Sequence, residues 1–274
     1  MSLYHRAAGI DHLERLAQGS SPIHRLHPGA KIITTIVYAA AVISFDRPVN
    51  PSGLTAFLLY PAILMALSGT PAKPLFTRLL AALPFSLMGG LSNLILLRAP
   101  VFFIGSIAVT AGMLSFVSIM LKTLLTVLAV LILIATTTFA DINWQLTRMG
   151  MPKILGLQFV MTWRYITALL GEAASMYTAY MVRTPGQKGI RMKDMGAFLG
   201  QLLLRSFDRA ERVYQAMKCR GFDGVYRGAA EQRFHLSDLV YTLGVSSLTV
   251  LLRFFNLSRF FGALVNRVLA ELLK

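Results

Sequence analysis

Charged residues are scarce in this chain: Asp, Glu, Lys and Arg make up 14% of its 274 residues, whereas hydrophobic residues make up 55%. Soluble domains carry about 25% charged residues, so the composition argues against a soluble protein. Several apolar runs are long enough to cross the roughly 30 Å hydrocarbon core of a bilayer. We therefore predict an all-α polytopic membrane protein, with the lipid bilayer as one of its partners.

Acidic residues are scarcer than basic ones, with 12 Asp and Glu against 27 Lys and Arg, which gives a net charge of +15. In a membrane protein, such an excess indicates cytoplasmic loops that follow the positive-inside rule. A basic surface can also meet anionic lipid or an acidic protein partner. Because no nucleic-acid recognition motif accompanies the charge, we expect no nucleic-acid partner.

The residues that usually carry chemistry are also few. The single cysteine, Cys219, excludes an internal disulfide and a cysteine metal cluster. The sequence holds no G-x-x-x-x-G-K-[ST] motif, so the chain is not expected to bind ATP by itself. His24 and His27 are three residues apart, but without a third ligand nearby they are interpreted as surface histidines before a helix. We expect no catalysis, no metal site and no cofactor in this chain.

Four apolar segments are predicted to cross the membrane before residue 138, over residues 30–45, 54–67, 79–97 and 113–135. Pro84 and the Gly89-Gly90 pair predict a kink or a close helix contact in the third segment. Lys122 lies inside the fourth, where it could snorkel, face the interior or mark a boundary. A fifth segment, residues 236–255, could also cross. In that case the basic tail would lie outside, against the charge bias, so the number of crossings stays open at four to five.

Residues 139–235 contain 14 Lys or Arg and 7 Asp or Glu, which predicts a cytoplasmic region. Four preceding crossings would place the N-terminus on the same side. The predicted organisation is therefore an N-terminal segment with four transmembrane helices over residues 1–138, a cytoplasmic coupling-helix domain over residues 139–235, and a C-terminal transmembrane helix with an amphipathic tail over residues 236–274.

The cytoplasmic region is predicted to hold two long helices. Residues 154–181 are apolar on most faces, and residues 192–218 have one apolar face at helical spacing. The sequence TPGQKG between them must break the helix, and Gly221 with Gly224 should stop the second one. Two such helices form a hairpin or a crossed pair. Before them, Asp141 is expected to cap a short helix that begins near Trp144.

An arginine stands at the end of each long helix, Arg183 after the first and Arg220 after the second. A guanidinium at a helix tip can donate several hydrogen bonds to a partner's carboxylates or carbonyl oxygens. Alternatively, each arginine caps the carbonyls of its own helix, an interaction worth about 0.3 to 1 kcal/mol. Cys219 is interpreted as a small residue at a helix contact rather than a reactive thiol.

Four stretches carry a resemblance to a known family: SSPIHRLHPGAK (residues 20–31), TTTFADINWQLTRMGMPKIL (136–155), WRYI (163–166) and RAERVYQAMKCRGFDG (209–224). Together they resemble the transmembrane T component of energy-coupling-factor transporters, in particular its cobalt-importer branch. The last stretch is the most specific of the four.

The resemblance implies a non-catalytic subunit in the bacterial inner membrane, with its N-terminus and coupling helices in the cytoplasm. In that family two Ala-Arg-Gly-like signatures end two coupling helices and dock on a pair of ATP-hydrolysing ABC subunits. The second signature falls on Cys219, Arg220 and Gly221; the first falls on Val182, Arg183 and Thr184, where only the arginine is kept. The resemblance favours partner docking over self-capping for both arginines.

The resemblance also implies a small membrane subunit that binds the transported ion, with cobalt favoured over nickel or a vitamin. Four residues of the second coupling helix are expected to press against it: Leu199, Leu203, Phe207 and Tyr214. Two other functions remain, a conventional importer permease with its own path and a stand-alone membrane receptor or channel. The permease alternative requires a Glu-Ala-Ala-x-x-x-Gly loop, of which only Glu172-Ala173-Ala174 is present.

Overall fold

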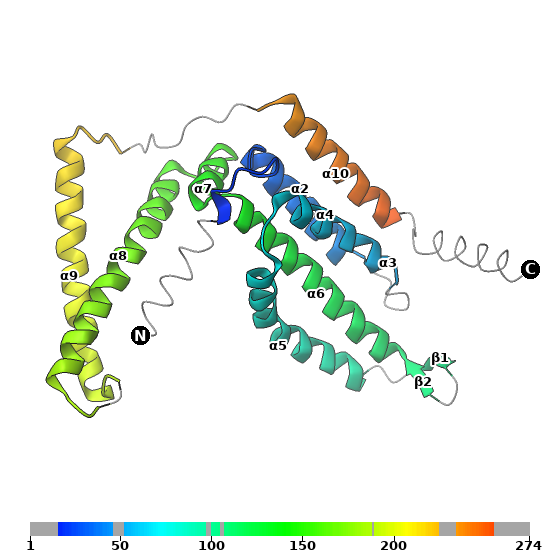
Figure 1. Cartoon of the computed structure of the whole chain (residues 1–274), viewed down its shortest axis with the longest axis horizontal. Helices are drawn as coiled ribbons and strands as arrows, with labels where there is room; N and C mark the ends of the chain where they lie inside the picture. Colours follow the sequence, from blue (N-terminus) through cyan, green and yellow to red (C-terminus); the bar gives the residue numbers. More distant parts are fainter. Residues whose placement is uncertain are drawn as a thin grey trace, which may run out of the picture. The chain divides into compact units, whose positions relative to one another are not determined.

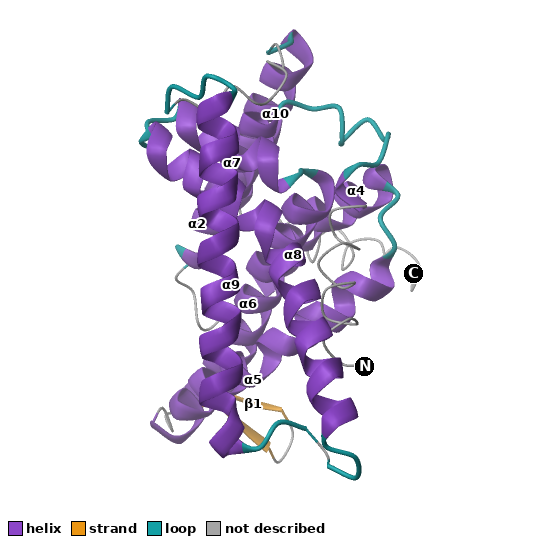
Figure 2. Ribbon diagram, turned by 90° about the vertical axis from the view of Figure 1, so that its left-hand side faces the viewer, coloured by secondary structure: helices purple, strands orange, loops and turns teal. Residues whose placement is uncertain are grey.

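The computed structural model describes residues 16–45, 52–96, 100–104, 107–187, 189–224 and 234–254. Over these residues the chain forms helices and one pair of short strands (Figure 1 and Figure 2). The elements are α2 (Pro28–Ile43), α3 (Ser52–Thr55), the 3-10 helix η1 (Ala56–Leu58), α4 (Leu59–Ser68), α5 (Ala72–Leu96), β1 (Pro100–Ile104), β2 (Ile107–Thr110), α6 (Ala111–Thr136), α7 (Phe139–Arg148), α8 (Lys153–Arg183), α9 (Met192–Cys219) and α10 (Leu236–Phe254).

Four of these helices are long and apolar enough to cross a membrane: α5, α6, α8 and α10. The chain is thus an all-α polytopic membrane protein, as predicted. The other two predicted spans, residues 30–45 and 54–67, correspond to shorter apolar helices. The 16 residues of α2, for example, extend over only about 24 Å at about 1.5 Å per residue, less than the thickness of the hydrocarbon core. α8 is also long and apolar enough to cross a membrane, although the charge pattern predicted that it belongs to the cytoplasmic region. The predicted amphipathic tail, residues 256–274, lies outside the described residues.

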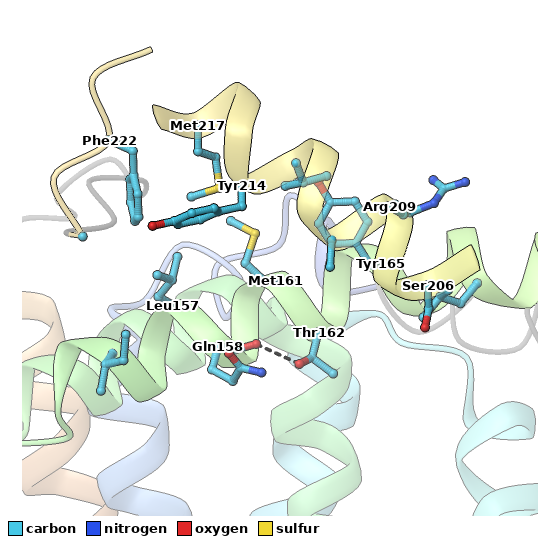
Figure 3. A pocket seen from close by; sticks show the side chains of 15 residues that line it. Leu157, Gln158, Met161, Thr162, Tyr165, Ser206, Arg209, Tyr214, Met217 and Phe222 are labelled. Atoms are coloured by element: carbon cyan, nitrogen blue, oxygen red, sulfur yellow. Dashed lines mark hydrogen bonds between the residues drawn. The ribbon is translucent and has the colours of Figure 1, made fainter. Parts of the chain in front are cut away.

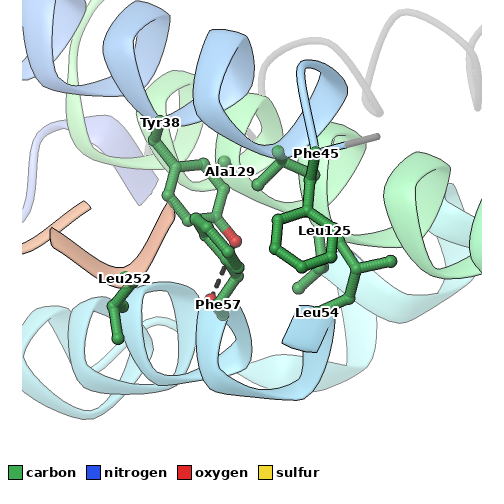
Figure 4. Packing of buried hydrophobic residues seen from close by; sticks show 8 residues of the cluster. Tyr38, Phe45, Leu54, Phe57, Leu125, Ala129 and Leu252 are labelled. Atoms are coloured by element: carbon green, nitrogen blue, oxygen red, sulfur yellow. Dashed lines mark hydrogen bonds between the residues drawn. The ribbon is translucent and has the colours of Figure 1, made fainter. Parts of the chain in front are cut away.

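The chain divides into two compact units, one made of residues 16–138 with residues 234–254, and the other of residues 139–224. In the first unit, α6 packs against α5, α2 and α4. Its core is built from aromatic and aliphatic side chains around Tyr38, whose hydroxyl donates to the carbonyl of Phe57 at 2.8 Å (Figure 4). A second cluster lies farther along α6 and includes Leu128, Ile132 and Ala135. The spacing of these residues is that of one buried helix face.

The third predicted span bends and makes a close helix contact. α5 contains Pro84 and changes direction along its length in Figure 1, as a proline inside a helix predicts. A Cβ atom on Gly90 would lie 2.6 Å from Cδ2 of Phe116, so this glycine lets α6 approach. No atom of the described residues lies within 4 Å of a Cβ built on Gly89, so among them the predicted close contact involves Gly90 and not Gly89. Lys122, whose position stayed open, donates from Nζ to the carbonyl of Ile43, the last residue of α2, at 3.2 Å.

Two local features differ from the sequence-based expectation. Between α5 and α6, β1 pairs with β2 in an antiparallel hairpin, which was not predicted from the sequence. Its β-branched residues, such as Ile104 paired with Ile107, suit a strand. The prediction that Asp141 caps a helix near Trp144 was wrong. Since α7 begins at Phe139, Asp141 lies inside its first turn, where its charge faces the positive end of the helix.

Two isoleucines on α6 provide a matched test of this packing. Ile132 is 1% exposed, whereas Ile134, two residues farther on, is 38% exposed. Ile132→Ala should lower the free energy of unfolding by about 2–5 kcal/mol, because it leaves a cavity in the core. Ile134→Ala should change it by about 0.5 kcal/mol or less. Unfolding by SDS in mixed micelles measures both, and equal losses would contradict the assignment of the core face.

Candidate coupling site

The two predicted long helices are present and differ from their predicted ends by no more than two residues, as α8 (Lys153–Arg183) and α9 (Met192–Cys219). The break between them occurs at the predicted TPGQKG sequence. Thr184 donates its backbone N–H and its hydroxyl to the carbonyl of Tyr180, at 3.1 and 2.8 Å, which closes the last turn of α8. Pro185 cannot continue the helix, and Gly186 adopts a left-handed φ of 83°.

A polar cluster fixes α9 to α8 beside this turn. The hydroxyl of Tyr180 donates to Oδ2 of Asp194 at 2.7 Å, and Nε of Arg191 donates to the same oxygen at 2.8 Å. These hydrogen bonds lower the pKa of the Asp194 carboxyl, and the bond from Tyr180 has the larger effect. The carboxylate therefore stays charged at neutral pH and holds the two helices in a hairpin.

Farther from the turn, Glu172 of α8 pairs with two arginines of α9. One carboxylate oxygen accepts from Arg205, and the other lies 3.7 Å from a guanidinium nitrogen of Arg209. This role was not predicted from the sequence, where Glu172-Ala173-Ala174 was considered only as part of a permease loop. The signal that could have found it is a lone carboxylate on one helix facing two arginines four residues apart on the next.

Away from the turn, the two helices diverge toward their open end (Figure 1). They leave an apolar groove of about 490 Å³ between the first half of α8 and the second half of α9. Figure 3 shows its lining, in which Tyr214, Met217 and Phe222 lie opposite Leu157 and Met161. The groove is thus next to the end of α9, where the predicted tip residues lie.

The end of α9 has a glycine-based cap. The N–H of Gly221 donates to the carbonyl of Lys218 at 2.9 Å, and the N–H of Phe222 donates to that of Met217 at 3.0 Å. Gly221 has a left-handed φ of 77°, which an L side chain rarely adopts. These are the bonds and the conformation of a Schellman motif, which satisfies the last carbonyls of a helix by the chain's own amides. Arg220 stands at the C-cap position, and its side chain is exposed.

Both helix ends leave their arginine available. At the end of α8, Thr184 already supplies the donors for the last turn, and Arg183 is exposed. Within the described ranges, the guanidinium of neither Arg183 nor Arg220 makes a hydrogen bond or an ion pair. Of the two interpretations of these arginines, self-capping therefore has no support from the geometry.

The hairpin places the two tips far apart. Because α8 and α9 are antiparallel, Arg183 lies at the turn and Arg220 at the open end. The 28 residues of α9 span about 42 Å at about 1.5 Å per residue. A single surface patch does not reach both tips, so the arrangement suits two separate contacts.

The structure places the other predicted residues as follows. Val182 is 76% exposed beside Arg183, and the predicted face of α9 is open to the surroundings, with exposures of 54–63% at Leu199, Leu203, Phe207 and Tyr214. Cys219 is exposed, so the prediction that it lies at a helix contact was wrong within this unit. Helical spacing in the sequence does not fix which residues at the end of α9 contact α8.

Ring nitrogens of the two histidines, His24 and His27, lie at hydrogen-bond distance from other groups of the protein. Nε2 of His24 donates to the carbonyl of Leu16 at 3.0 Å while Nδ1 lies 2.7 Å from Ser21 Oγ, and Nδ1 of His27 accepts from the N–H of Gly29 at 3.1 Å. His27 is 5% exposed, so its interpretation as a surface histidine was wrong. No group of three or more possible metal ligands occurs among the described residues.

Comparison with known proteins identifies the family of this chain. Residues 19–235 match the CbiQ family model, whose description is cobalt transport protein. The chain belongs to this family. The matched range includes α2 to α9 and both arginine tips. Together with relatives named as energy-coupling factor transmembrane proteins, the match confirms the resemblance to the transmembrane T component of energy-coupling factor transporters.

Individual relatives of this CbiQ-family chain are distant. The chain is 25% identical over 243 residues to the energy-coupling factor transporter transmembrane protein EcfT of Listeria innocua, covering 82% of this chain and 88% of the relative. It is 29% identical over 103 residues to the nickel permease LarQ of Lactiplantibacillus plantarum, covering 38% of each. A match to an uncharacterized protein of Methanocaldococcus jannaschii, 24% identical over 123 residues, spans 42% of that protein.

Glu172→Gln should loosen the hairpin at its open end, because it removes the charge that pairs with Arg205 and Arg209. Partly exposed ion pairs are worth about 0.2–1 kcal/mol each, so the helices should stay folded while their separation broadens. Spin labels at Lys153 and Ala216, in a Cys219→Ala background, report this separation by pulsed electron resonance. Glu211→Gln, on an exposed part of α9, is the control, and an unchanged distance distribution for Glu172→Gln would contradict the role of the pair.

Proposed function

We propose that this chain is the energy-coupling transmembrane subunit of an energy-coupling factor importer, in which two ABC ATPase subunits dock on the helix tips at Arg183 and Arg220. The observation that carries the proposal is the pair of exposed arginines at opposite ends of one hairpin, in a chain of the CbiQ family. The coupling subunit transmits the ATPase movement to a membrane subunit that binds the substrate. It performs no catalysis itself.

The chemistry of the tips suits docking on a protein groove. A guanidinium offers five N–H donors in a planar fork and stays charged at any physiological pH. At Arg220, the absence of a Cβ atom on Gly221 and the small side chain of Cys219 leave room for a partner close to the helix end. At Arg183, the neighbours are Val182 and Thr184, which keep less of the family signature. We therefore assign the principal contact to Arg220.

The hairpin provides the transmission between the tips and the membrane. Closure of the two ATPases around ATP changes the angle between α8 and α9, which are joined at the turn and at Glu172. α9 turns its apolar residues Leu199, Leu203 and Phe207 outward, and α8 is apolar enough to lie against lipid. Burying apolar area stabilises by about 25 cal/mol per Å², so this face can hold the substrate-binding subunit without a covalent link.

The position of Glu172-Ala173-Ala174 counts against a conventional permease. The three residues lie inside α8, and Glu172 is engaged with α9, whereas a permease presents this motif in a loop. The stand-alone receptor or channel alternative gives no reason for two exposed arginine tips. A coupling subunit accounts for the position of Glu172 inside a helix and for the two arginine tips. In this proposal α8 and α9 lie on the cytoplasmic side of a bacterial plasma membrane.

Cobalt is the substrate we propose, bound by the partner membrane subunit. The matched family model is described as a cobalt transport protein, while one relative is named a nickel permease. Both are divalent first-row ions, so uptake must be measured for each of them.

Removing one guanidinium should uncouple the tips from the ATPases. In the reconstituted complex, Arg220→Ala should reduce uptake at least tenfold and weaken ATPase binding, because a charge-assisted contact of about 1.5–3 kcal/mol is lost. Arg183→Ala should reduce both by a smaller factor. Co-purification and ATP-driven uptake into vesicles measure these effects.

Arg212→Ala is the matched control for these two variants. Arg212 is exposed in the body of α9, away from either tip, and should leave both readouts unchanged. Wild-type ATPase binding and uptake by Arg220→Ala would rule out the proposed docking.

The substrate is tested by uptake of radioactive cobalt and nickel into vesicles that contain the whole complex. ATP-dependent cobalt uptake that excess unlabelled nickel only partly suppresses is expected. Uptake of nickel without cobalt would contradict the substrate assignment while leaving the coupling role intact.

A further inference from the structure

Three helix ends of the first unit meet at a buried group of polar residues. They are the N-terminus of α2, the N-terminus of α10 and the C-terminus of α6. The residues at this point are exposed by no more than 5%, and we call them the anchor: His27, Lys31, Thr136 and Asp238.

A single carboxylate joins two of these helices. Oδ1 of Asp238 accepts the backbone N–H of His27 at 2.9 Å, and Oδ2 accepts that of His235 at 2.8 Å. His27 is the N-cap residue of α2, and His235 precedes the first residue of α10. Asp238 therefore caps its own helix and the start of a helix 211 residues away in sequence. A negative charge is favourable where the positive ends of two helices converge.

A single ammonium joins the third helix to the same point. Nζ of Lys31, in the first turn of α2, donates to the carbonyl of Thr136 at 2.8 Å and to that of His24 at 3.2 Å. Thr136 is the last residue of α6, so the positive charge lies at the negative end of that helix. Buried charges are costly unless they are paired and hydrogen-bonded. Here Asp238 accepts from two amides at helix starts, and Lys31 donates to the last carbonyl of α6 and to the carbonyl of His24.

The anchor lies where the chain leaves the first unit and where it returns. Only Thr137 and Thr138 separate α6 from α7, and thus from the unit that contains α8 and α9. The chain comes back just before His235 and α10. Lys31 thus joins the start of α2 to the end of α6, where the chain leaves the first unit. Asp238 joins the start of α2 to the start of α10, where the chain returns.

We propose that the anchor fixes both chain connections of the coupling unit, so that force applied at the helix tips turns the coupling helices instead of pulling their connections out of place. Asp238 and Lys31 are positioning residues in this account. This inference rests on the proposed function for its role in transport, but the fixing of the two connections stands on the geometry alone.

The test uses the complete complex in vesicles, with Asp238→Asn and Lys31→Met. Both variants should keep ATPase binding and at least half of the ATP hydrolysis, while cobalt taken up per ATP hydrolysed falls about tenfold. Thr249→Val is the matched control, because Thr249 is 3% exposed on α10 and its hydroxyl donates to the carbonyl of Val245 in the same helix. Lys31→Arg keeps the charge and should restore most of the ratio that Lys31→Met loses.

A ratio equal to that of the wild type in both variants would overturn the inference. So would a parallel loss of ATPase binding, hydrolysis and uptake that Lys31→Arg does not rescue, because this pattern indicates a structural role only.

Hydrogen exchange on the full chain separates this inference from the proposed function. In Asp238→Asn, the amides of His27 and His235 should exchange about tenfold faster or more, since they lose bonds to a charged acceptor. Thr249→Val should leave them unchanged. Unaltered exchange in Asp238→Asn overturns the anchor, whereas faster exchange in a chain that binds no ATPase sustains the anchor and contradicts the proposed function.

Discussion

The antiparallel pairing of α8 and α9 is the constraint on which the account depends. The turn at Thr184 to Arg191 reverses the chain, and the contacts of Asp194 and Glu172 keep the second helix beside the first. Because the helices run in opposite directions, their C-terminal ends lie about 42 Å apart, the length of α9. A parallel arrangement would bring both arginines to one place and would suit a single partner instead of two.

The tips and the anchor both depend on which groups hydrogen-bond to the backbone at the helix ends. At the tips, Thr184 and Gly221 close the last turns with the chain's own donors, which leaves the two guanidinium groups outward. At the anchor, charged side chains satisfy helix ends inside the protein, with Asp238 at two N-termini and Lys31 at a C-terminus. Helix ends that are closed by backbone and threonine donors thus leave their arginines exposed, whereas helix ends that are closed by charged side chains are joined to one another.

Much of the fold could be predicted from the sequence, because hydrophobic spacing and breakers act locally. The limits of α8 and α9 follow from apolar periodicity, TPGQKG and Gly221, and the arginines follow from their place at those limits. The burial of His27 could not be predicted, because its ring packs against Phe234 and its N–H bonds to Asp238, both more than 200 residues away in the sequence. The pairing of Glu172 with Arg205 and the exposure of Cys219 could not be predicted either, because both depend on how α9 packs against α8.

The central claim is that each tip holds a separate ATPase, and site-specific crosslinking tests it most directly. Photoreactive residues at positions 183, 220 and, as a control, 212 would be introduced into the assembled complex, and the products would be identified by mass spectrometry. The account predicts that positions 183 and 220 each capture an ATPase subunit, that a doubly labelled chain captures two, and that position 212 captures none. Capture of no ATPase from either tip, or of the same single subunit from both, would contradict it.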